Sequence, residues 1–241
     1  MTGYWVALVT QDWRYRMVVP GRGEYFGIPL NQRAKDYADA WSRQKEEAAG
    51  TECSAYGAAA LMEVPTRLHI SWADDLTLQV ETDAGKQTRL LHFTPTAAAG
   101  APAPDMSGAS TPRSLQGWSA ASWQLAGTQS SRGMGIGMGG SENDPPRGSG
   151  AGLPASGTLK VATTRLSAGL LRKNGLPYSD QSSMLEYWDV HKDPVSGLEL
   201  LTVTTELSDP VYLQAPYVHN PIFVRETDAS KWDPTPCSLQ W

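Results

Sequence analysis

The chain has 241 residues, 40% of them hydrophobic and 19% charged, with a formal net charge of −5 at pH 7. A chain of this length buries roughly 70% of its unfolded surface, which is enough for a hydrophobic core of its own. The acidic balance argues against nucleic acid and anionic lipid as partners, since both select basic surfaces, and no apolar run approaches the roughly 18 residues of a membrane-spanning helix, so no membrane insertion is expected.

The first predicted elements are a strand and a helix. Residues 3–10 ("GYWVALVT") alternate weakly, as a strand does. Residues 31–50 carry the one convincing helical pattern, because Asn31 is a suitable N-cap and Gly50 a suitable terminator. The apolar stripe of this helix consists of Ala34, Tyr37, Ala38, Trp41 and Ala48. Such a stripe predicts a helix that packs across a sheet or a barrel mouth.

Beyond Pro65 the hydrophobic period changes from about 3.6 residues to about 2, the period of a β-strand. Strands are predicted at 66–72, 76–82, 87–93, 117–125, 158–166, 183–191, 198–207 and 217–226. Short strands at this spacing, behind a single helix, indicate an antiparallel sheet that closes into a barrel or folds into a sandwich. We therefore predict a mainly β protein with one domain over residues 1–241.

Two segments interrupt this pattern, at about 95–114 and 127–157. Both are rich in Ala, Gly, Pro and Ser, so we interpret them as long loops between strands, with a domain boundary as the alternative. The second contains a G-x-G-x-x-G at Gly135, Gly137 and Gly140. It lacks the preceding strand and following helix that a dinucleotide site requires, and no organic cofactor is expected.

The stretch 67–93 forms three predicted strands joined by two turns, "ADD" and "DAGK". The first turn pairs His69 with Gln79, and the second pairs Thr77 with His92, unless a bulge shifts the register. One face is then apolar and holds Leu68, Ile70, Trp72, Leu76, Leu78, Val80, Leu91 and Phe93. The other face is largely polar and holds Arg67, His69, Ser71, Thr77, Gln79, Glu81, Thr88, Leu90 and His92.

The polar face has two interpretations. It faces water, as in an ordinary one-sided antiparallel sheet, or it lines a wet cavity and forms a site. In a cavity the proton-transfer groups would be His69, His92 and Glu81, with substrate contacts from Arg67, Gln79 and Trp72. If the polar face lies outside, the candidate site moves to residues 172–186. That segment is either a solvated turn or a second set of substrate contacts, Arg172, Tyr178, Asp180 and Glu186.

A metal shared by His69 and His92 is disfavoured. The two residues lie two strand spacings apart and are offset by two residues, which separates their Cα atoms by roughly 11–12 Å. A metal would need a third ligand, and no spacing signature supplies one. Of the other histidines, His191 stands beside a turn and is expected to be solvated, whereas His219 is a further site candidate on a late strand.

The two cysteines, Cys53 and Cys237, are either separate reduced thiols or a disulfide that anchors the C-terminal segment. A disulfide would fit an oxidising compartment.

Several motifs together resemble a family of exported bacterial proteins, most of them uncharacterised, that is associated with a lipocalin-like (calycin-type) β-barrel. The motifs are "GYWV…TQDWR", "GIPLN", "RKNGLPYSD…LEY" and "DPVYL…P", and they span nearly the whole chain except the two loops. The resemblance implies a periplasmic or secreted protein, with Met1 in place of an export signal. It also favours a disulfide between Cys53 and Cys237. Its motif positions include Arg172, Asn174, Gly175, Ser179 and Glu186.

Three functions remain open from the sequence. The first is an enzyme that uses acid/base chemistry in a barrel cavity on a small, largely apolar substrate, as an isomerase, cyclase, lyase or hydrolase. The second is a periplasmic carrier of a hydrophobic small ligand, and the third is an interaction module. The signatures of the common serine hydrolases, zinc proteases and phosphate-binding loops are absent from the sequence. A homodimer is compatible with the sequence.

Overall fold

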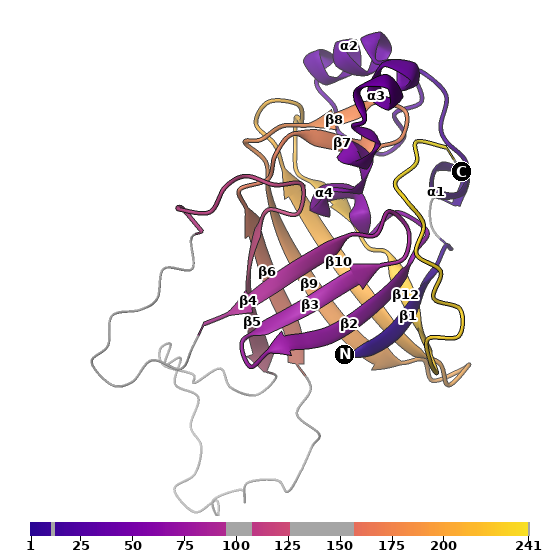
Figure 1. The fold of residues 1–241 in the computed structure, drawn as a ribbon, viewed down its shortest axis with the longest axis vertical. Coiled ribbons are helices and arrows are strands. Elements are labelled where there is room, and N and C mark those ends of the chain that lie inside the picture. The colour runs from indigo at the N-terminus through magenta and orange to yellow at the C-terminus, as the bar shows by residue number, and fades with distance from the viewer. Residues whose placement is uncertain (11–12, 95–107, 126–156, 241) are drawn as a thin grey trace, which may run out of the picture.

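The computed structural model describes residues 1–10, 13–94, 108–125 and 157–240, in which a closed barrel of nine strands is the central feature (Figure 1). The strands in order around the barrel are β10 (Glu199–Ser208), β12 (Ile222–Glu226), β1 (Gly3–Leu8), β2 (Arg67–Asp74), β3 (Thr77–Thr82), β4 (Thr88–Phe93), β5 (Trp118–Leu125), β6 (Gly157–Thr164) and β9 (Ser183–Lys192). Pairing of β9 with β10 closes the barrel. The short strand β11 (Tyr217–His219) adds to β10 outside this ring.

The barrel is not purely antiparallel, which corrects the sequence prediction. Strands β4 and β5 run parallel, with Leu91 paired with Ser119 and Phe93 with Ala121. A parallel pair requires a connection of about a dozen residues or more that returns to the starting edge. The segment between β4 and β5 is long enough for that return. Local alternation of residues cannot reveal strand direction, so the error was not visible in the sequence.

The predicted strand registers are partly confirmed. Between β3 and β4 the pairing of Thr77 with His92 is as predicted. Between β2 and β3 it is wrong by two residues, because a bulge between Trp72 and Asp74 places His69 opposite Glu81. A shift of two residues keeps every side chain on its face, so the division into an apolar and a polar face is unaffected.

The apolar face points into the barrel. Every barrel strand contributes buried side chains to one core, which contains Trp5, Leu68, Ile70, Leu78, Val80, Leu91, Ala121, Leu159, Val161, Trp188, Leu201, Val203 and Phe223, together with Met62 from the segment before β2. Burial of these side chains is the main stabilising contribution to the barrel.

A cap of short helices and one hairpin covers one end of the barrel, at the top of Figure 1. Its elements are α1 (Trp13–Met17), α2 (Gln32–Ala40), α3 (Arg43–Ala49), the 3₁₀ helix η1 (Glu52–Tyr56), α4 (Ala58–Leu61), β7 (Gly169–Arg172) and β8 (Leu176–Tyr178). A second apolar cluster joins this cap to the ends of β9 and β10, including Leu166, Leu176, Tyr178, Met184 and Leu207.

The predicted helix 31–50 is two helices. Asn31 caps α2 as expected, accepting a hydrogen bond from the backbone N–H of Ala34 at 3.0 Å, and Gly50 ends α3 in the left-handed conformation. The helix breaks at Trp41, which is extended. The Trp41 ring lies against Gly175, where an added Cβ would come within 2.5 Å of it and where φ is +88°. The packing of the ring on the β7–β8 turn therefore accounts for both the break and the glycine.

Other predictions have varied outcomes. The strand predicted at 217–226 is interrupted between β11 and β12, and the hairpin β7–β8 was not predicted. Most of the two predicted loops, with the glycine motif at 135–140, lies outside the described residues. Among the helices of the described ranges, none has the length and apolar character needed to cross a membrane. The single-domain assignment stays a prediction.

A disulfide between Cys53 and Cys237 anchors the C-terminal segment to the cap, 184 residues away in sequence. The segment makes further contacts on both sides of this bond. The backbone N–H of Thr235 donates to the carbonyl oxygen of Asp83 at 2.9 Å. The Tyr56 hydroxyl donates to the carbonyl oxygen of Ser238, also at 2.9 Å. The C-terminal segment thus ties the helical cap to the side of the barrel.

Candidate functional site

The polar face of β2 to β4 lies outside the barrel, because its apolar counterpart fills the interior. His69 and Glu81 are brought together there, with 2.9 Å between His69 Nδ1 and a Glu81 carboxylate oxygen. The His69 ring also stacks on Tyr4, with 4.4 Å between ring centroids, and meets the edge of Trp232. These contacts hold β1, β2 and the C-terminal segment together, so the role of His69 that they support is structural.

His92 is not brought to the same place. It pairs with Thr77 at the other end of β3 and stacks on Trp118 with 3.9 Å between ring centroids. Burial lowers its pKa, against the opposing effect of the Asp74 carboxylate. Gln79 is half-buried on the outer face, while Trp72 is 47% exposed at the uncapped end of the barrel. A catalytic role for His69, His92 and Glu81 stays a prediction, and His92 lies apart from the other two.

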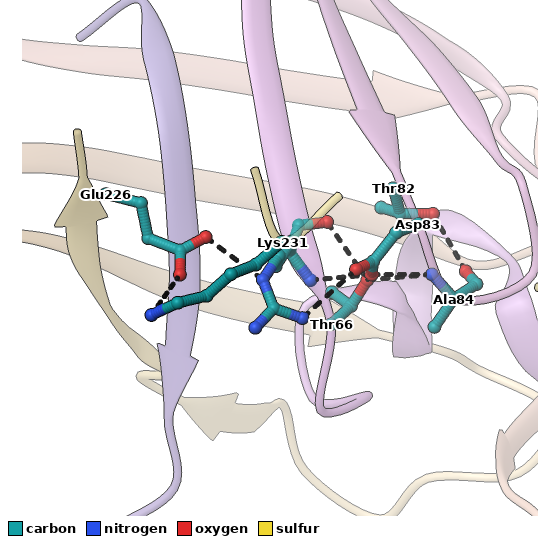
Figure 2. Close-up of polar contacts among 7 residues, drawn as sticks. Thr66, Thr82, Asp83, Ala84, Glu226 and Lys231 are labelled. Atoms are coloured by element: carbon teal, nitrogen blue, oxygen red, sulfur yellow. Dashed lines mark hydrogen bonds and ion pairs between the residues drawn. The ribbon is translucent and has the colours of Figure 1, made fainter. Parts of the chain in front are cut away.

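Arg67 takes part in an ionic network on the outer wall rather than in a cavity of the barrel interior (Figure 2). Its guanidinium lies 3.0 Å from Glu226 and 3.5 Å from Asp83, and Lys231 approaches Glu226 at 3.6 Å. One oxygen of Asp83 accepts hydrogen bonds from the Thr66 hydroxyl at 2.8 Å and from the backbone N–H groups of Arg67 and Ala84 at 2.7 Å. The network holds the β3–β4 turn and the C-terminal segment in place.

Histidine, cysteine and carboxylate side chains do not gather in groups of three or more among the described residues. A further ligand that would join His69 and His92 at a metal is therefore not found in that part of the chain.

The four candidates of segment 172–186 are dispersed. Asp180 is exposed and forms an ion pair with Arg113 at 3.7 Å. Tyr178 is buried in the second apolar cluster, where burial raises the pKa of its hydroxyl. Glu186 lies inside the barrel and forms a buried, doubly hydrogen-bonded pair with Arg89. Arg172 reaches a cavity.

Arg172 lines a cavity of about 260 Å³ between the cap and the barrel end, which we call the mouth cavity. Its walls come from α1, the loop at Phe26 and Gly27, the segment after α4, β7, and β11 with the residues that follow it. The polar side chains of the wall are Arg16, Glu63, Arg172, Tyr217, His219 and Asn220. Five distant parts of the sequence thus converge on one small space, which is typical of ligand sites.

His219 is the central group of the mouth cavity. Its side chain is buried, and neither ring nitrogen has a hydrogen-bond partner among the described residues. Nδ1 lies 3.6 Å from a carboxylate oxygen of Glu63, which is close but beyond hydrogen-bond length. Buried polar groups are nearly always paired, so an imidazole of this kind at a cavity wall indicates a place for a ligand.

The electrostatics keep His219 neutral at pH 7. Burial lowers its pKa most, the guanidinium groups of Arg16 and Arg172 lower it further, and the Glu63 and Glu186 carboxylates oppose them. A neutral imidazole has one N–H donor and one lone pair, so it can accept a proton.

Tyr217 and Arg16 hold Glu63 in place from two sides. The Tyr217 hydroxyl donates to the Glu63 carboxylate at 3.1 Å, and Arg16 Nε donates to the Glu63 carbonyl oxygen at 2.8 Å. Burial, together with the Glu63 charge, raises the pKa of Tyr217, so the hydroxyl keeps its proton. The mouth cavity therefore contains a proton acceptor, His219, beside a positioned carboxylate.

Sequence reasoning included His219 and Arg172 but missed Arg16, Glu63 and Tyr217. These three stand on a short helix, a turn and a short strand, none of which has a motif. Arg89 was detectable, since it alternates with Leu91 and Phe93 on the inward face of β4, and a charge at an inward position implies a buried partner.

We expect the wild-type protein to lose stability relative to His219→Gln as the pH falls from 8 to 5. In the unfolded chain a histidine takes up a proton near pH 6.5, whereas the folded state resists because the pKa of His219 is lowered. The contribution of the neutral His219 to the free energy of unfolding is complete above about pH 6.5, and it is lost as the pH falls from there through the pKa of His219 in the folded state. Urea unfolding at both pH values measures the difference. The His191→Gln variant, which replaces an exposed histidine, serves as the control. If the stability of His219→Gln changed with pH as much as that of the wild-type protein, a buried neutral imidazole at position 219 would be contradicted.

Comparisons with protein-family models, with curated proteins and with solved structures find no match to this chain. The functional argument therefore rests on the residues and geometry of the mouth cavity.

Proposed function

We propose that this protein binds a small, largely apolar molecule in the mouth cavity and that His219 moves a proton to or from it. The protein would then be a cofactor-independent enzyme of the isomerase, cyclase, lyase or hydrolase type. The observation that carries the proposal is the buried His219 ring, at the wall of a cavity that also contains Glu63; its nitrogens lack hydrogen-bond partners within the described ranges of the chain.

The roles of the neighbouring groups follow from their charges. A neutral imidazole is suited to general-base catalysis near pH 7. Once it takes a proton, the nearby Glu63 carboxylate stabilises the imidazolium, as the third member of a catalytic triad does for its histidine. Tyr217 holds that carboxylate through the hydrogen bond from its hydroxyl.

The location of the protein is part of the proposal. A disulfide between Cys53 and Cys237 is compatible with the periplasm or the extracellular space, because such bonds persist in oxidising compartments. The resemblance to exported proteins with a lipocalin-like barrel supports the same assignment.

The second candidate is a carrier that binds a hydrophobic molecule and leaves it unchanged. The apolar part of the cavity wall, from Phe26, Val218 and Pro221, favours it. A carrier and an enzyme differ in whether the bound molecule exchanges protons with His219.

Proton exchange into bound molecules separates the two functions. A panel of small ketones and aldehydes is incubated with the protein in D₂O, binding is detected by NMR, and deuterium is followed at the carbon next to the carbonyl group. An enzyme is expected to accelerate exchange into a bound compound, and His219→Gln is expected to slow it by about 10²- to 10⁴-fold, the usual contribution of a general base. His191→Gln is the matched control. Binding without exchange would favour the carrier, and absence of any binding would overturn both functions.

A further inference from the structure

We propose that the protein has a second small-molecule site, beside Asn174 in the cap, which binds a neutral molecule with neighbouring hydroxyl groups, a monosaccharide or a comparable small polyol. The site is a cavity of about 230 Å³, which we call the Asn174 cavity. Its described wall residues do not overlap with those of the mouth cavity. The inference therefore goes beyond the proposed function and does not depend on it.

The Asn174 cavity lies where three parts of the cap meet (Figure 1). Its walls come from the segment 19–22, from the break between α2 and α3, and from the β7–β8 turn. Arg22 Nη2 donates to the carbonyl oxygen of Trp41 at 3.4 Å, and the Trp41 ring packs on Gly175. These two contacts join the three walls, so the cavity is part of the folded cap.

The first observation is an amide oxygen without a hydrogen-bond partner. Asn174 is only 7% exposed. Its Nδ2 donates to the backbone carbonyl oxygens of Gly21 at 3.2 Å and Glu24 at 3.1 Å, which uses both of its hydrogens. These bonds fix the orientation of the amide, because a flipped amide would set Oδ1 against two acceptors. Oδ1 itself is buried and accepts no hydrogen bond from the described residues.

A donor on the same wall also lacks a hydrogen-bond partner. Arg43 Nε is buried, and no acceptor in the described ranges bonds to it. A Glu47 carboxylate oxygen lies 3.7 Å from this nitrogen, which is close enough for an ion pair and too far for a hydrogen bond. Buried polar atoms are nearly always paired, so an unpaired acceptor and an unpaired donor at one cavity indicate a ligand that serves both.

These two atoms select the class of ligand. A fully ionised carboxylate or phosphate only accepts hydrogen bonds, so it would leave Asn174 Oδ1 unpaired. The Arg43 guanidinium already has the Glu47 carboxylate beside it, which favours a neutral ligand. A hydroxyl group both donates and accepts, and its hydrogen rotates to suit its neighbours. Neighbouring hydroxyl groups on one molecule therefore satisfy Oδ1 and Nε together.

The rest of the wall sets the size and the body of the ligand. Val19, Pro20 and Ala38 present apolar surface. The Ser42 hydroxyl donates to Gln44 and retains the capacity to accept. A cavity of about 230 Å³ is smaller than the usual range of roughly 300–1,000 Å³ for small-molecule sites. This volume suits a single ring whose C–H groups contact the apolar side chains.

Probes with and without hydroxyl groups test the inference by NMR titration of the full chain. Glucose and the vicinal cyclohexanediol carry neighbouring hydroxyl groups, whereas tetrahydropyran has a ring of the same size and accepts hydrogen bonds only. Acetate, inorganic phosphate and acetamide represent other classes of ligand. We expect glucose or the diol to bind more tightly than any of these four compounds. The signals of the Arg43 Nε–H and of the Asn174 side-chain amide should move on binding.

Variants locate the binding. Arg43→Met removes the donor and Asn174→Leu removes the acceptor, and each is expected to weaken polyol binding by about three- to tenfold, the loss typical of one hydrogen bond. Lys45→Met removes a positive charge from an exposed position of the same helix and should leave binding unchanged. Asn174→Leu also loses the bonds to Gly21 and Glu24, so amide spectra must show that it is folded. If it is not, Arg43→Met, which keeps those bonds, decides the inference.

The remaining outcomes would overturn the inference. Tetrahydropyran that binds as tightly as the polyols would show that no donor is required. Tighter binding of acetate, phosphate or acetamide at the Asn174 cavity would overturn the choice of a polyol. Signals that move only around His219 would place the polyol in the mouth cavity, and failure of both polyols to bind would remove the second site. The proton-exchange experiment on the proposed function is independent of all these results.

Discussion

Replacing Arg89 with methionine is expected to lower the free energy of unfolding by about 3–5 kcal/mol, the usual cost of leaving one member of a buried ion pair alone. Arg89 and Glu186 have side chains that are 0% exposed, and Arg89 Nη1 donates to a Glu186 carboxylate oxygen at 3.0 Å. Arg89 also donates to the hydroxyl groups of Ser119 and Thr163, at 3.1 and 2.7 Å. The substitution would leave the Glu186 carboxylate charged and unpaired in the barrel core.

The double variant distinguishes a lost ion pair from a poorly packed side chain. Arg89→Met combined with Glu186→Leu removes both charges, and a well-packed apolar replacement of a buried pair is often neutral or stabilising. We therefore expect the double variant to be more stable than either single variant. Urea unfolding measures all three, and Arg43→Met, which breaks the partly exposed pair with Glu47, should change stability by less than about 1 kcal/mol. A double variant as unstable as the sum of the single variants would contradict this account.

The ion pair also bears on the mouth cavity. Glu186 is paired across the sheet with Thr205, and Thr205 is paired with His219. The Glu186 carboxylate raises the pKa of His219. The double variant should therefore lower the pKa of His219 further, which an NMR titration of this histidine would detect.

Removal of the disulfide is the second change with a large expected effect. The double substitution Cys53→Ala and Cys237→Ala should lower the free energy of unfolding by about 2–5 kcal/mol. The bond closes a loop over a sequence separation of 184 residues, so in the unfolded chain it excludes many conformations. In the folded state the last residues have other anchors, including Leu239, which is fully buried. The fold should therefore persist with a lower unfolding midpoint.

Reduction of the wild-type protein provides the control for this prediction. The urea unfolding curves measured with and without a thiol reductant should differ for the wild-type protein and coincide for the double cysteine variant. Limited proteolysis should remove the segment after Trp232 faster in the variant, since only non-covalent contacts, the hydrogen bonds of Ser238 and Thr235 and the burial of Leu239, would then hold it. Equal midpoints for the oxidised and reduced wild-type protein would contradict a stabilising role of the disulfide.

Local sequence patterns determined most of the secondary structure of this protein. Alternation of apolar and polar residues placed the strands at 67–74, 77–82 and 88–93 within two residues of their predicted ends, and it divided their side chains correctly into two faces. The cap at Asn31 was equally local, because an N-cap depends on a side chain and a backbone group three residues apart. Features of this kind depend on neighbours in the chain, and the sequence displays neighbours directly.

The tertiary structure alone decided which face is inside, the parallel pairing of β4 with β5, and the composition of the mouth cavity. Arg16, Glu63, Arg172 and His219 are separated by dozens of residues, and they meet because the cap closes over one end of the barrel. The pairing of Arg89 with Glu186 likewise crosses the barrel core over 97 positions of sequence. Barrel closure and cap packing bring distant residues together, and no local period in the chain encodes such contacts.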